Sequence, residues 1–265
     1  MSTDFLSALR LDGRGVIVLG AGQGIGEAAA RALAQAGGKV LCVDREAELA
    51  EQVASAIGGL ACVADVTQRP DMERIFATAL KSFGNIRGVV DIVGMAKLKP
   101  LGAFTDADYE WQFDIGFRHA YLALQIGAPI VAQSGGGSFT FVGSISGIGS
   151  LPNEVIYGAS KAALHHLARA AAVELGPSGV RVNAIAPGFV RTPRLDRMVT
   201  PERWVEIGAE IPLGHVAVPD DVAGPLLFLT SDLSSHISGA VLAIDGGLGA
   251  MAAIPQAFIK TLKGQ

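Results

Sequence analysis

Short runs of Val, Ile and Leu recur along the chain and alternate with longer, Ala-rich stretches in which apolar residues return every three or four positions. The short runs are continuously apolar, as parallel strands are when both faces of their sheet are covered. They predict seven buried strands, at residues 16–19, 39–43, 60–63, 88–93, 138–142, 180–186 and 240–244.

The longer stretches predict helices, several of which end at a glycine. These helices span residues 24–36, 46–57, 70–83, 106–133, 154–175 and 219–230, with closing glycines at Gly37, Gly58, Gly84 and Gly176. Strands that alternate with helices in this order form right-handed βαβ units. The pattern therefore predicts an α/β fold of the doubly wound, Rossmann-like class, in which a seven-stranded parallel sheet has helices on both faces.

No linker, low-complexity tract or internal repeat divides the chain, so we expect one domain over residues 1–265. The longest stretch without a helix or strand signal is residues 188–218. Irregular segments of this length in compact domains are usually lids or binding loops, and we expect this one to be the substrate loop. It contains Met198, Trp204, Arg191, Arg194, Arg197 and Arg203.

Composition argues against several partners. Only 17% of the residues are charged and the formal net charge is -4, so no cationic face is expected for nucleic acid. The longest apolar run, residues 120–132, is shorter than the roughly 20 residues that span a bilayer. The first residues include Asp4 and lack the apolar centre of a secretion signal. We therefore expect a cytoplasmic protein with neither nucleic-acid nor membrane partners.

The two cysteines, Cys42 and Cys62, each lie in an apolar, strand-like run. In a reducing compartment such thiols are buried and free far more often than they are paired or metal-bound. Since no His or Cys spacing is typical of a zinc site, no metal is expected.

The first expected strand leads directly into a glycine-rich turn and then a helix. Glycines at Gly20, Gly24 and Gly26 allow a tight turn and a close approach to a pyrophosphate, and the start of the helix supplies N–H groups. Gln23 and Ile25 belong to the same turn. The alternative is a plain strand-to-helix connection, because short glycine motifs also occur by chance.

Acidic residues at two strand ends favour a dinucleotide site. Asp44 ends the second strand, eighteen residues after Gly26 (44 minus 26), where a carboxylate binds adenosine ribose hydroxyls and repels a 2′-phosphate. NAD is thus favoured over NADP, although the adjacent Arg45 could pair with a phosphate. Asp65, which precedes Val66, could reach the adenine. Both aspartates could instead cap the helices that follow them.

The stretch from Ser144 to Lys161 carries candidate chemistry. Tyr157 and Lys161 are four positions apart, so they share one face of a helix and the ammonium lies near the phenol. A nearby cation lowers the pKa of a phenol from about 10 toward the working range, which makes it a usable acid and base. Ser144 follows a strand and could hold a substrate oxygen. In isolation, this Tyr and Lys spacing is more often ordinary helix surface.

Together these motifs resemble the short-chain dehydrogenase/reductase family over nearly the whole chain. The matching pieces are residues 20–26, Asp44, Asp65, Ser144, Tyr157, Lys161, residues 183–188, Thr192 and residues 245–247. The resemblance implies that Tyr157 is the general acid and base and that Ser144 orients the carbonyl. It also implies that Lys161 lowers the pKa of the tyrosine and binds the nicotinamide ribose.

The resemblance further implies which residues surround the nicotinamide. These are Pro187, Gly188, Val190 and Thr192, and Val93 and Gly94 are also expected to bind the cofactor. The expected reaction is hydride transfer between NAD(H) and a secondary alcohol or ketone. The resemblance also implies a homo-oligomer, a tetramer or a dimer, and the helices at 106–133 and 154–175 are apolar enough to form its interface.

The sequence departs from the family pattern at two places. Relatives read Asn-Asn-Ala-Gly after the fourth strand, whereas this chain has Asp91 to Gly94, which alters the side-chain brace of that strand. The asparagine of the usual catalytic tetrad falls at Gly116, and a family glycine falls at His119. Our hypothesis is that water, in the room left by the glycine, or His119 takes over the proton relay behind the lysine. Packing of His119 against a subunit neighbour is an equal alternative.

The substrate is expected to meet Ser144 and an apolar wall. The wall residues are Met95, Phe189, Met198 and Trp204, which are compatible with cyclic, aromatic or terpenoid alcohols and with acyl chains. His165 and His166 point in different directions on a helix and are interpreted as packing or interface residues. The loop arginines are either solvated or contact an acidic substrate.

Two other functions stay open at this point. One is a non-catalytic or regulatory subunit that binds NAD, motivated by Asp91 and Gly116. The other is an NADP-dependent ketoreductase of the 3-oxoacyl type, with which Asp44 conflicts.

Overall fold

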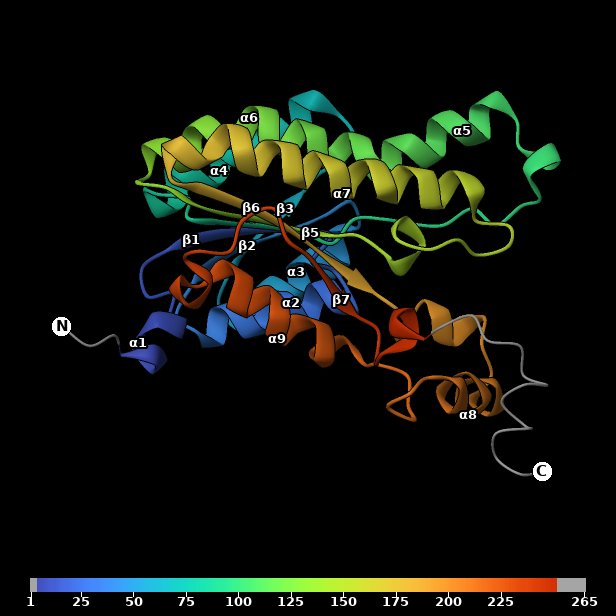
Figure 1. The fold of residues 1–265 in the computed structure, drawn as a ribbon. Coiled ribbons are helices and arrows are strands. Elements are labelled where there is room, and N and C mark those ends of the chain that lie inside the picture. Colours follow the sequence, from blue (N-terminus) through green and yellow to red (C-terminus); the bar gives the residue numbers. More distant parts are fainter. Residues whose placement is uncertain (1–3, 252–265) are drawn as a thin grey trace.

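A parallel sheet organises residues 4–251, which are the part of the chain that the computed structural model describes (Figure 1). Its strands are β1 (Gly15–Leu19), β2 (Lys39–Asp44), β3 (Leu60–Val63), β4 (Gly88–Asp91), β5 (Gly137–Val142), β6 (Val180–Pro187) and β7 (Val241–Ile244). They lie in the order β3-β2-β1-β4-β5-β6-β7, and each neighbouring pair is parallel. The expected doubly wound, seven-stranded sheet is confirmed.

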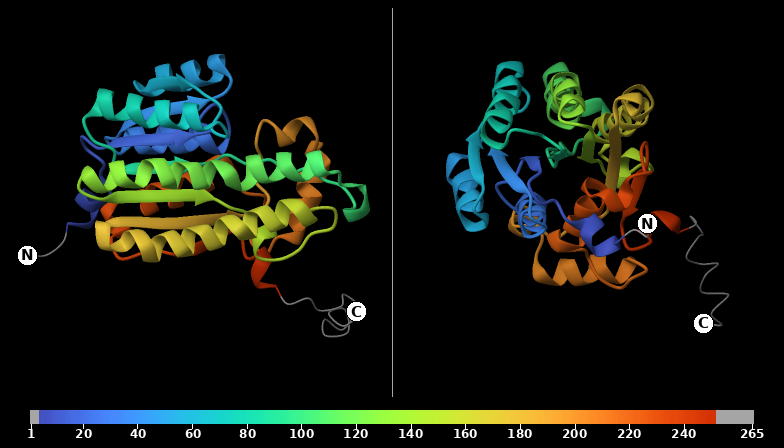
Figure 2. Two further views of the ribbon diagram at one scale, coloured as in Figure 1. Left: turned by 90° about the horizontal axis from the view of Figure 1, so that it is seen from above. Right: turned by 90° about the vertical axis from the view of Figure 1, so that its left-hand side faces the viewer.

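Helices cover both faces of this sheet (Figures 1 and 2). They are α1 (Phe5–Leu9), α2 (Ile25–Gln35), α3 (Ala47–Ile57), α4 (Arg69–Phe83), α5 (Asp106–Phe113), α6 (His119–Gln133), α7 (Val155–Leu175), α8 (Pro201–Glu210) and α9 (Pro219–Thr230). One face carries α4, α6 and α7, and the other carries α2, α3 and α9. Helices α5 and α8 extend past the sheet at one end of the molecule.

Each face of the sheet has its own apolar core, and the central strand contributes to both. In β1, Ile17 and Leu19 pack with α4, α6 and α7, whereas Val16 and Val18 pack with α2, α3 and α9. All four side chains are fully buried. This two-sided burial explains why the strands read as continuous apolar runs rather than as alternating ones.

Glycines end several helices as expected, with one exception. Helix α3 ends at Gly58 and α4 at Gly84, with φ of 66° and 77°, a left-handed conformation that glycine adopts without a steric penalty. At the end of α7, however, Gly176 is right-handed and begins a 3-10 turn, and the left-handed residue is Gly179. The helix ends where the sequence predicts, but the glycine that reverses the chain comes later than expected.

Two expected elements differ in detail. The helix expected at 106–133 consists of α5 and α6, joined by a π-helical turn at Asp114–Arg118. The stretch 188–218, expected to be irregular, contains α8. The side chain of Thr200 accepts a hydrogen bond from the Arg203 amide and Pro201 opens the helix, which is a helix start that the sequence prediction missed.

Two further expectations concern the cysteines and the membrane. Cys42 and Cys62 are free and buried, as expected, and burial raises the pKa of the Cys42 thiol to about 12. Within residues 4–251, no helix combines the length and the apolar character that crossing a bilayer requires.

Candidate active site

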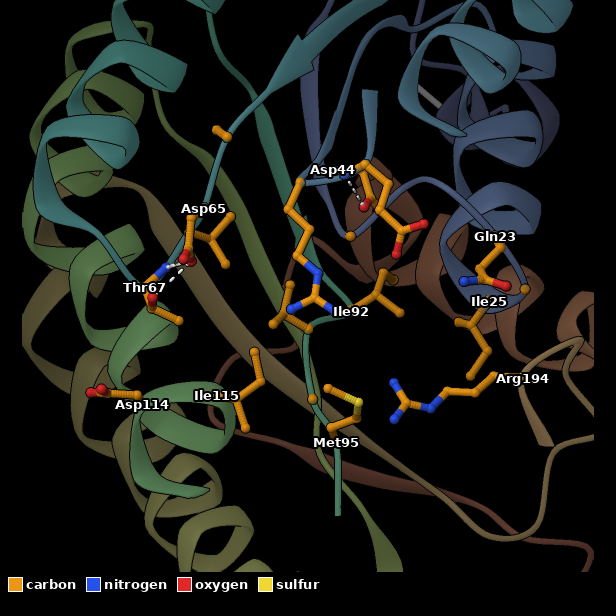
Figure 3. Close-up of a pocket in the computed structure, with 18 of the residues that line it drawn as sticks. Gln23, Ile25, Asp44, Asp65, Thr67, Ile92, Met95, Asp114, Ile115 and Arg194 are labelled. Carbon is orange, nitrogen blue, oxygen red and sulfur yellow. Dashed lines mark hydrogen bonds between the residues drawn. The ribbon is translucent and has the colours of Figure 1, made fainter. Parts of the chain in front are cut away.

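A cavity of about 400 Å³ opens where the carboxyl ends of β1 to β4 meet (Figure 3). Ligands of doubly wound sheets bind at this edge. Most of the predicted cofactor residues line it, namely Gly20, Gln23, Gly24, Ile25, Asp44, Arg45, Asp65, Val66, Val93, Gly94 and Thr192. Sequence segments that are far apart thus meet at one cavity.

The glycine turn forms the floor of this cavity. A Cβ at Gly26 would lie 1.9 Å from the carbonyl oxygen of Gly20, so the helix packs on the turn only if this residue is glycine. Gly20 and Gly24 have φ of 81° and 60°. The start of α2 therefore presents its N–H groups beside an open surface of backbone, which is the arrangement that binds a pyrophosphate.

The carboxylate of Asp44 lies over this turn. One oxygen accepts a hydrogen bond from the Gly22 amide at 2.9 Å, and the other accepts one from the Glu46 amide at 3.1 Å. A Cβ at Gly22 would lie 2.6 Å from the carboxylate, so this glycine leaves room for the acidic side chain. Asp44 faces the cavity, where a ribose would bind, and also contacts the residue that precedes α3.

Asp65 lies beside the cavity at the end of β3 and is held by Thr67. The Asp65 carboxylate accepts hydrogen bonds from the Thr67 amide at 2.9 Å and from its hydroxyl at 2.7 Å (Figure 3). The residue before α4 is Gln68, so Asp65 is not the cap of that helix.

Sequence reasoning missed several lining residues. They are Glu46, Ala64, Thr67, Ile92, Trp111, Asp114, Ile115 and Arg194. Arg194 was noted only as one of several loop arginines, but its side chain extends into the cavity from the segment after β6 (Figure 3). Trp111 and Ile115 come from α5 and the π-helical turn, and no local motif marks them.

Ser144 and Tyr157 are brought together at the end of β5 and the start of α7. Ser144 is buried, and its hydroxyl oxygen accepts a hydrogen bond from the Ser146 amide at 3.1 Å. Ser144 lies close enough to the Tyr157 hydroxyl to lower the pKa of the tyrosine. Burial has the larger effect and raises this pKa, and Glu154 raises it further. A substrate oxygen beside the tyrosine would meet both hydroxyl groups.

Lys161 lies fully buried beneath these residues. Its ammonium donates hydrogen bonds to the carbonyl oxygens of Val142 at 2.9 Å and Val93 at 3.3 Å. A Cβ at Gly94 would lie 2.6 Å from Nζ, so that glycine makes room for the ammonium. Burial lowers the pKa of Lys161 to about 8, and the charge of Asp91 opposes that shift. The lysine is not among the causes of the pKa shift at Tyr157, in contrast to the direct effect expected from their spacing.

His165 supports the serine from behind. It is 2% exposed, and its Nε2 accepts a hydrogen bond from the Ser144 amide at 3.4 Å. Burial and the nearby Lys161 charge lower the pKa of His165 to about 4, so the ring is neutral and can accept that bond. His165 is therefore a packing residue within the chain, whereas His166 is exposed.

The two departures from the family pattern lie behind the lysine. His119 is fully buried within the chain, so the expected alternative, packing against a subunit neighbour, is wrong. Its Nδ1 lies 2.7 Å from the carboxylate of Asp91, which is buried as well. At Gly116 a Cβ would lie 2.4 Å from the hydroxyl oxygen of Ser160, so the glycine makes room for Ser160 rather than for solvent.

Of the four apolar residues expected to contact substrate, one lines the cavity, two are exposed and one is buried elsewhere. Met95 lines the cavity. Met198 and Phe189 are exposed, with 71% and 38% of their surface accessible. Trp204 is buried in α8, and its indole N–H donates to Asp196 at 2.8 Å, so it anchors the loop and does not line this cavity.

Of the remaining predicted cofactor residues, Pro187 and Gly188 lie at the end of β6. Gly188 donates to the Ile244 carbonyl, and a Cβ there would lie 3.0 Å from Asp245. Val190 is buried and pairs with Ala217 in a parallel bridge. These residues do not line the described cavity, but they lead directly to Thr192, which does.

A glycine-rich turn at the carboxyl edge of a parallel sheet is typical of dinucleotide-binding enzymes. The chain belongs to the short-chain dehydrogenase/reductase family: a family model described as enoyl-(acyl carrier protein) reductase matches residues 20–249.

Its similarity to individual relatives extends over nearly the full length. A 3-oxoacyl-(acyl-carrier-protein) reductase of Thermotoga maritima is 32% identical, covering 91% of this chain and 99% of the relative. A galactitol 2-dehydrogenase (L-tagatose-forming) of Cereibacter sphaeroides is 34% identical over 92% and 98%. The solved structure of a 7α-hydroxysteroid dehydrogenase with NADH and 7-oxo glycochenodeoxycholic acid is 32% identical, with a TM-score of 0.87 over 93% and 98%.

Proposed function

We propose that this protein is an NAD(H)-linked oxidoreductase that interconverts a secondary alcohol and a ketone, with Ser144, Tyr157 and Lys161 as its catalytic residues. The observation that carries the proposal is that Ser144 lies close enough to the Tyr157 hydroxyl to lower its pKa, with the buried Lys161 ammonium on the same helix as the tyrosine. Without a function in proton transfer, a buried lysine would be a costly feature of a small domain.

The residues around the cleft suit a dinucleotide. The glycine turn offers N–H groups and open backbone to a pyrophosphate, and Asp44 offers a carboxylate to the ribose hydroxyls. The same negative charge would repel a 2′-phosphate, which favours NAD over NADP. NAD(H) would supply the hydride acceptor or donor in this cleft.

The chain itself would handle the proton. In ketone reduction, the Tyr157 hydroxyl donates a proton to the substrate oxygen while the Ser144 hydroxyl holds that oxygen by a hydrogen bond. In alcohol oxidation, Tyr157 accepts the proton. The family resemblance implies that Lys161 binds the nicotinamide ribose and that its positive charge favours the deprotonated tyrosine, whereas in the structure burial, Ser144 and Glu154 set the pKa of Tyr157.

We infer an apolar or cyclic substrate from Met95, which lines the cavity, and Phe189, which lies half-exposed in the segment after β6. The relatives named above act on acyl, sugar and steroid compounds, so the family allows several classes. A second candidate is an NADP-dependent ketoreductase of the 3-oxoacyl type, favoured by Arg45, whose side chain lines the cleft beside Asp44.

We further infer a cytoplasmic homo-oligomer, a tetramer or dimer. Two buried free thiols suit a reducing compartment. On the outer layer formed by α5, α6 and α7, Tyr109, Tyr121 and Val173 expose 49%, 42% and 81% of their surface. Light scattering tests the assembly: a dimer or tetramer is expected, and a purely monomeric protein contradicts it.

The catalytic assignment is tested with Tyr157→Phe. We expect turnover to fall by at least about a hundredfold on a panel of alcohols and ketones, because one proton donor is removed. NADH binding, measured by fluorescence, should persist. If the wild-type protein binds NADH but turns over nothing on a broad panel, and Tyr157→Phe changes nothing, the non-catalytic alternative replaces this proposal.

A further inference from the structure

Behind the proposed active site lies a buried acid and base pair that the reaction does not use directly. The His119 Nδ1 and an Asp91 carboxylate oxygen are 2.7 Å apart, and neither side chain exposes more than 1% of its surface. Asp91 ends β4 and His119 begins α6. A carboxylate buried this completely costs free energy unless it is paired, so its position calls for a charged or donating partner on more than one side.

The second oxygen of Asp91 links the pair to the lysine. It accepts a hydrogen bond from the Val93 amide at 3.1 Å, and the Val93 carbonyl accepts one from Lys161 at 3.3 Å. His119, Asp91, Val93 and Lys161 thus form a continuous hydrogen-bonded series from α6 through the end of β4 to α7. The hydrogen bond from the Val93 amide to Asp91 fixes the position of Val93, and the carbonyl oxygen of Val93 is one of the two that the Lys161 ammonium contacts.

Among the charged groups near Lys161, Asp91 is the one whose negative charge acts on the ammonium, although the two side chains form no direct ion pair. On α7 itself, Tyr157 is uncharged at neutral pH and His165 is kept neutral by burial. From the π-helical turn, Asp114 and Arg118 pair with each other at 3.5 Å on the exposed side. Glu154, before α7, bonds to Ser146 at 2.5 Å. Among the described residues, the charge that opposes the effect of burial on the lysine pKa is that of Asp91.

We propose that Asp91, clamped by His119 and by the Val93 amide, is a positioning residue that holds the Lys161 ammonium in place and keeps it protonated. This inference rests on the proposed function, since Lys161 is catalytic only if that proposal holds. It also gives a reason for the two departures from the family pattern. Relatives have a neutral asparagine at the position of Asp91 and a glycine at that of His119, whereas this chain has a charge with its own hydrogen-bond donor.

The geometry favours positioning over a proton relay through His119. Among the described residues, no protein group lies within hydrogen-bond distance of the buried Nε2 atom of His119, so Asp91 is the only protein hydrogen-bond partner of the ring. A relay needs a partner on both nitrogens. Gly116 supplies no side chain here, and Ser160 occupies the adjacent space.

The test is the pH profile of Asp91→Asn. Asparagine has the same shape and keeps an oxygen for the Val93 amide, but it removes the charge. Without the carboxylate, Lys161 should lose its proton at lower pH. We expect the alkaline limb of kcat/KM for alcohol oxidation to move down by about one pH unit. An unchanged limb, in a variant with wild-type melting and NADH binding, overturns the proposal.

Matched variants separate a local effect of the Asp91 carboxylate from a change in net charge. Asp232→Asn removes one negative charge at the far end of the sheet, where Asp232 pairs with Arg14, and should leave the profile unchanged. A shift of equal size there would mean that net charge is responsible, and would overturn the proposal. If Asp91→Asn does not fold, Asp91→Ser removes the same charge with a smaller side chain and is scored in the same way.

His119→Asn tests positioning against relay, because an asparagine amide can donate to Asp91 but does not titrate. If His119 only positions Asp91, the pH profile of kcat/KM should match that of the wild type. A loss of turnover beyond tenfold, with a normal melting temperature, would favour a relay and overturn the proposal. Tyr157→Phe is run alongside. An active Tyr157→Phe refutes the proposed function itself, whereas an inactive one with an unshifted Asp91→Asn profile refutes only the role of Asp91.

Discussion

The carboxylate of Asp44 illustrates how a single side chain depends on the absence of another. It can lie over the glycine turn because Gly22 has no Cβ, and in that position it accepts a hydrogen bond from the Gly22 amide. Any larger residue at Gly22 would displace it from the place where a ribose would bind. If Asp44 sets the proposed preference for NAD, that preference is a property of two residues, one acidic and one without a side chain.

Substitution of Asp44 tests this preference. Asp44→Ala removes the charge that repels a 2′-phosphate and leaves Arg45 free to pair with it. We expect the ratio of kcat/KM for NADP to that for NAD to rise by about tenfold or more, because a charge contact of this kind contributes about 1.4 kcal/mol or more. Steady-state kinetics with both cofactors measure it.

The control is Arg45→Ala, which keeps the carboxylate and removes the cation. It should lower any residual NADP activity and leave the NAD activity largely intact. A wild-type enzyme that already prefers NADP would contradict the assignment of Asp44 and favour the 3-oxoacyl alternative.

At the residue scale, the positions that carried motifs were predicted from the sequence, and those placed by loop paths were not. Asp44 ends a strand and Tyr157 lies on a helix, so local patterns located both. Trp204 was expected to contact substrate but is bonded to Asp196, because α8 turns its indole inward. That orientation depends on packing between loop and domain, which residue spacing does not encode.

At the scale of elements, the strands were predicted within about two residues from their apolar runs. Burial on both faces explains such a run in an inner strand such as β1, whereas the edge strands β3 and β7 are partly exposed. The π-helical turn between α5 and α6 could not be predicted, since it reflects how Gly116 meets α7. The turn lets the backbone approach Ser160 closely. Local widening of a helix of this kind is frequent at functional sites, where it re-aims neighbouring groups.

This close approach predicts the effect of Gly116→Ala. The added Cβ would meet the Ser160 hydroxyl at 2.4 Å, and Ser160 is fully buried with its hydroxyl bonded to the Tyr157 carbonyl at 2.7 Å. We expect the free energy of unfolding to fall by about 1–3 kcal/mol, as overpacking of a core does. Urea unfolding measures it.

A double variant checks the cause. In Ser160→Ala the hydroxyl is gone, so the cost of Gly116→Ala should fall by an amount that a double-mutant cycle reports. Equal costs in both backgrounds would mean that helix geometry, and not the contact with Ser160, requires glycine. Gly102, which has open space at its Cβ position, offers a matched glycine for comparison.

At the scale of the whole molecule, buried bases make stability depend on pH. The pKa of His165 is about 4 in the folded protein and 6.5 in the unfolded chain, so the unfolded chain binds more protons between these values. Stability therefore falls as pH drops from 6.5 to 4. Lys161 also makes stability rise with pH, in the range between its pKa of about 8 in the folded protein and 10.5 in the unfolded chain, because the unfolded chain binds more protons there.

We expect His165→Gln to remove most of the stability that is lost as pH falls from 6.5 to 4. Glutamine keeps an oxygen that can accept the hydrogen bond from the Ser144 amide, but it does not titrate. The difference in unfolding free energy between pH 6.5 and pH 4 should shrink by about 2 kcal/mol, after allowance for partial solvent screening. Melting temperatures across that range measure it. His166→Gln, at the exposed neighbouring position, is the control and should leave the dependence of stability on pH unchanged.

The order of the strands has a consequence for how the protein can be made. β1 is the first strand to be synthesised and lies in the interior of the sheet, and every later strand pairs with one that already exists. Nascent chains fold from the amino terminus as they emerge. The ribosome can therefore build this sheet outward from its centre, so that β1 to β4, which surround the cavity, can pair before the proposed catalytic residues have been translated.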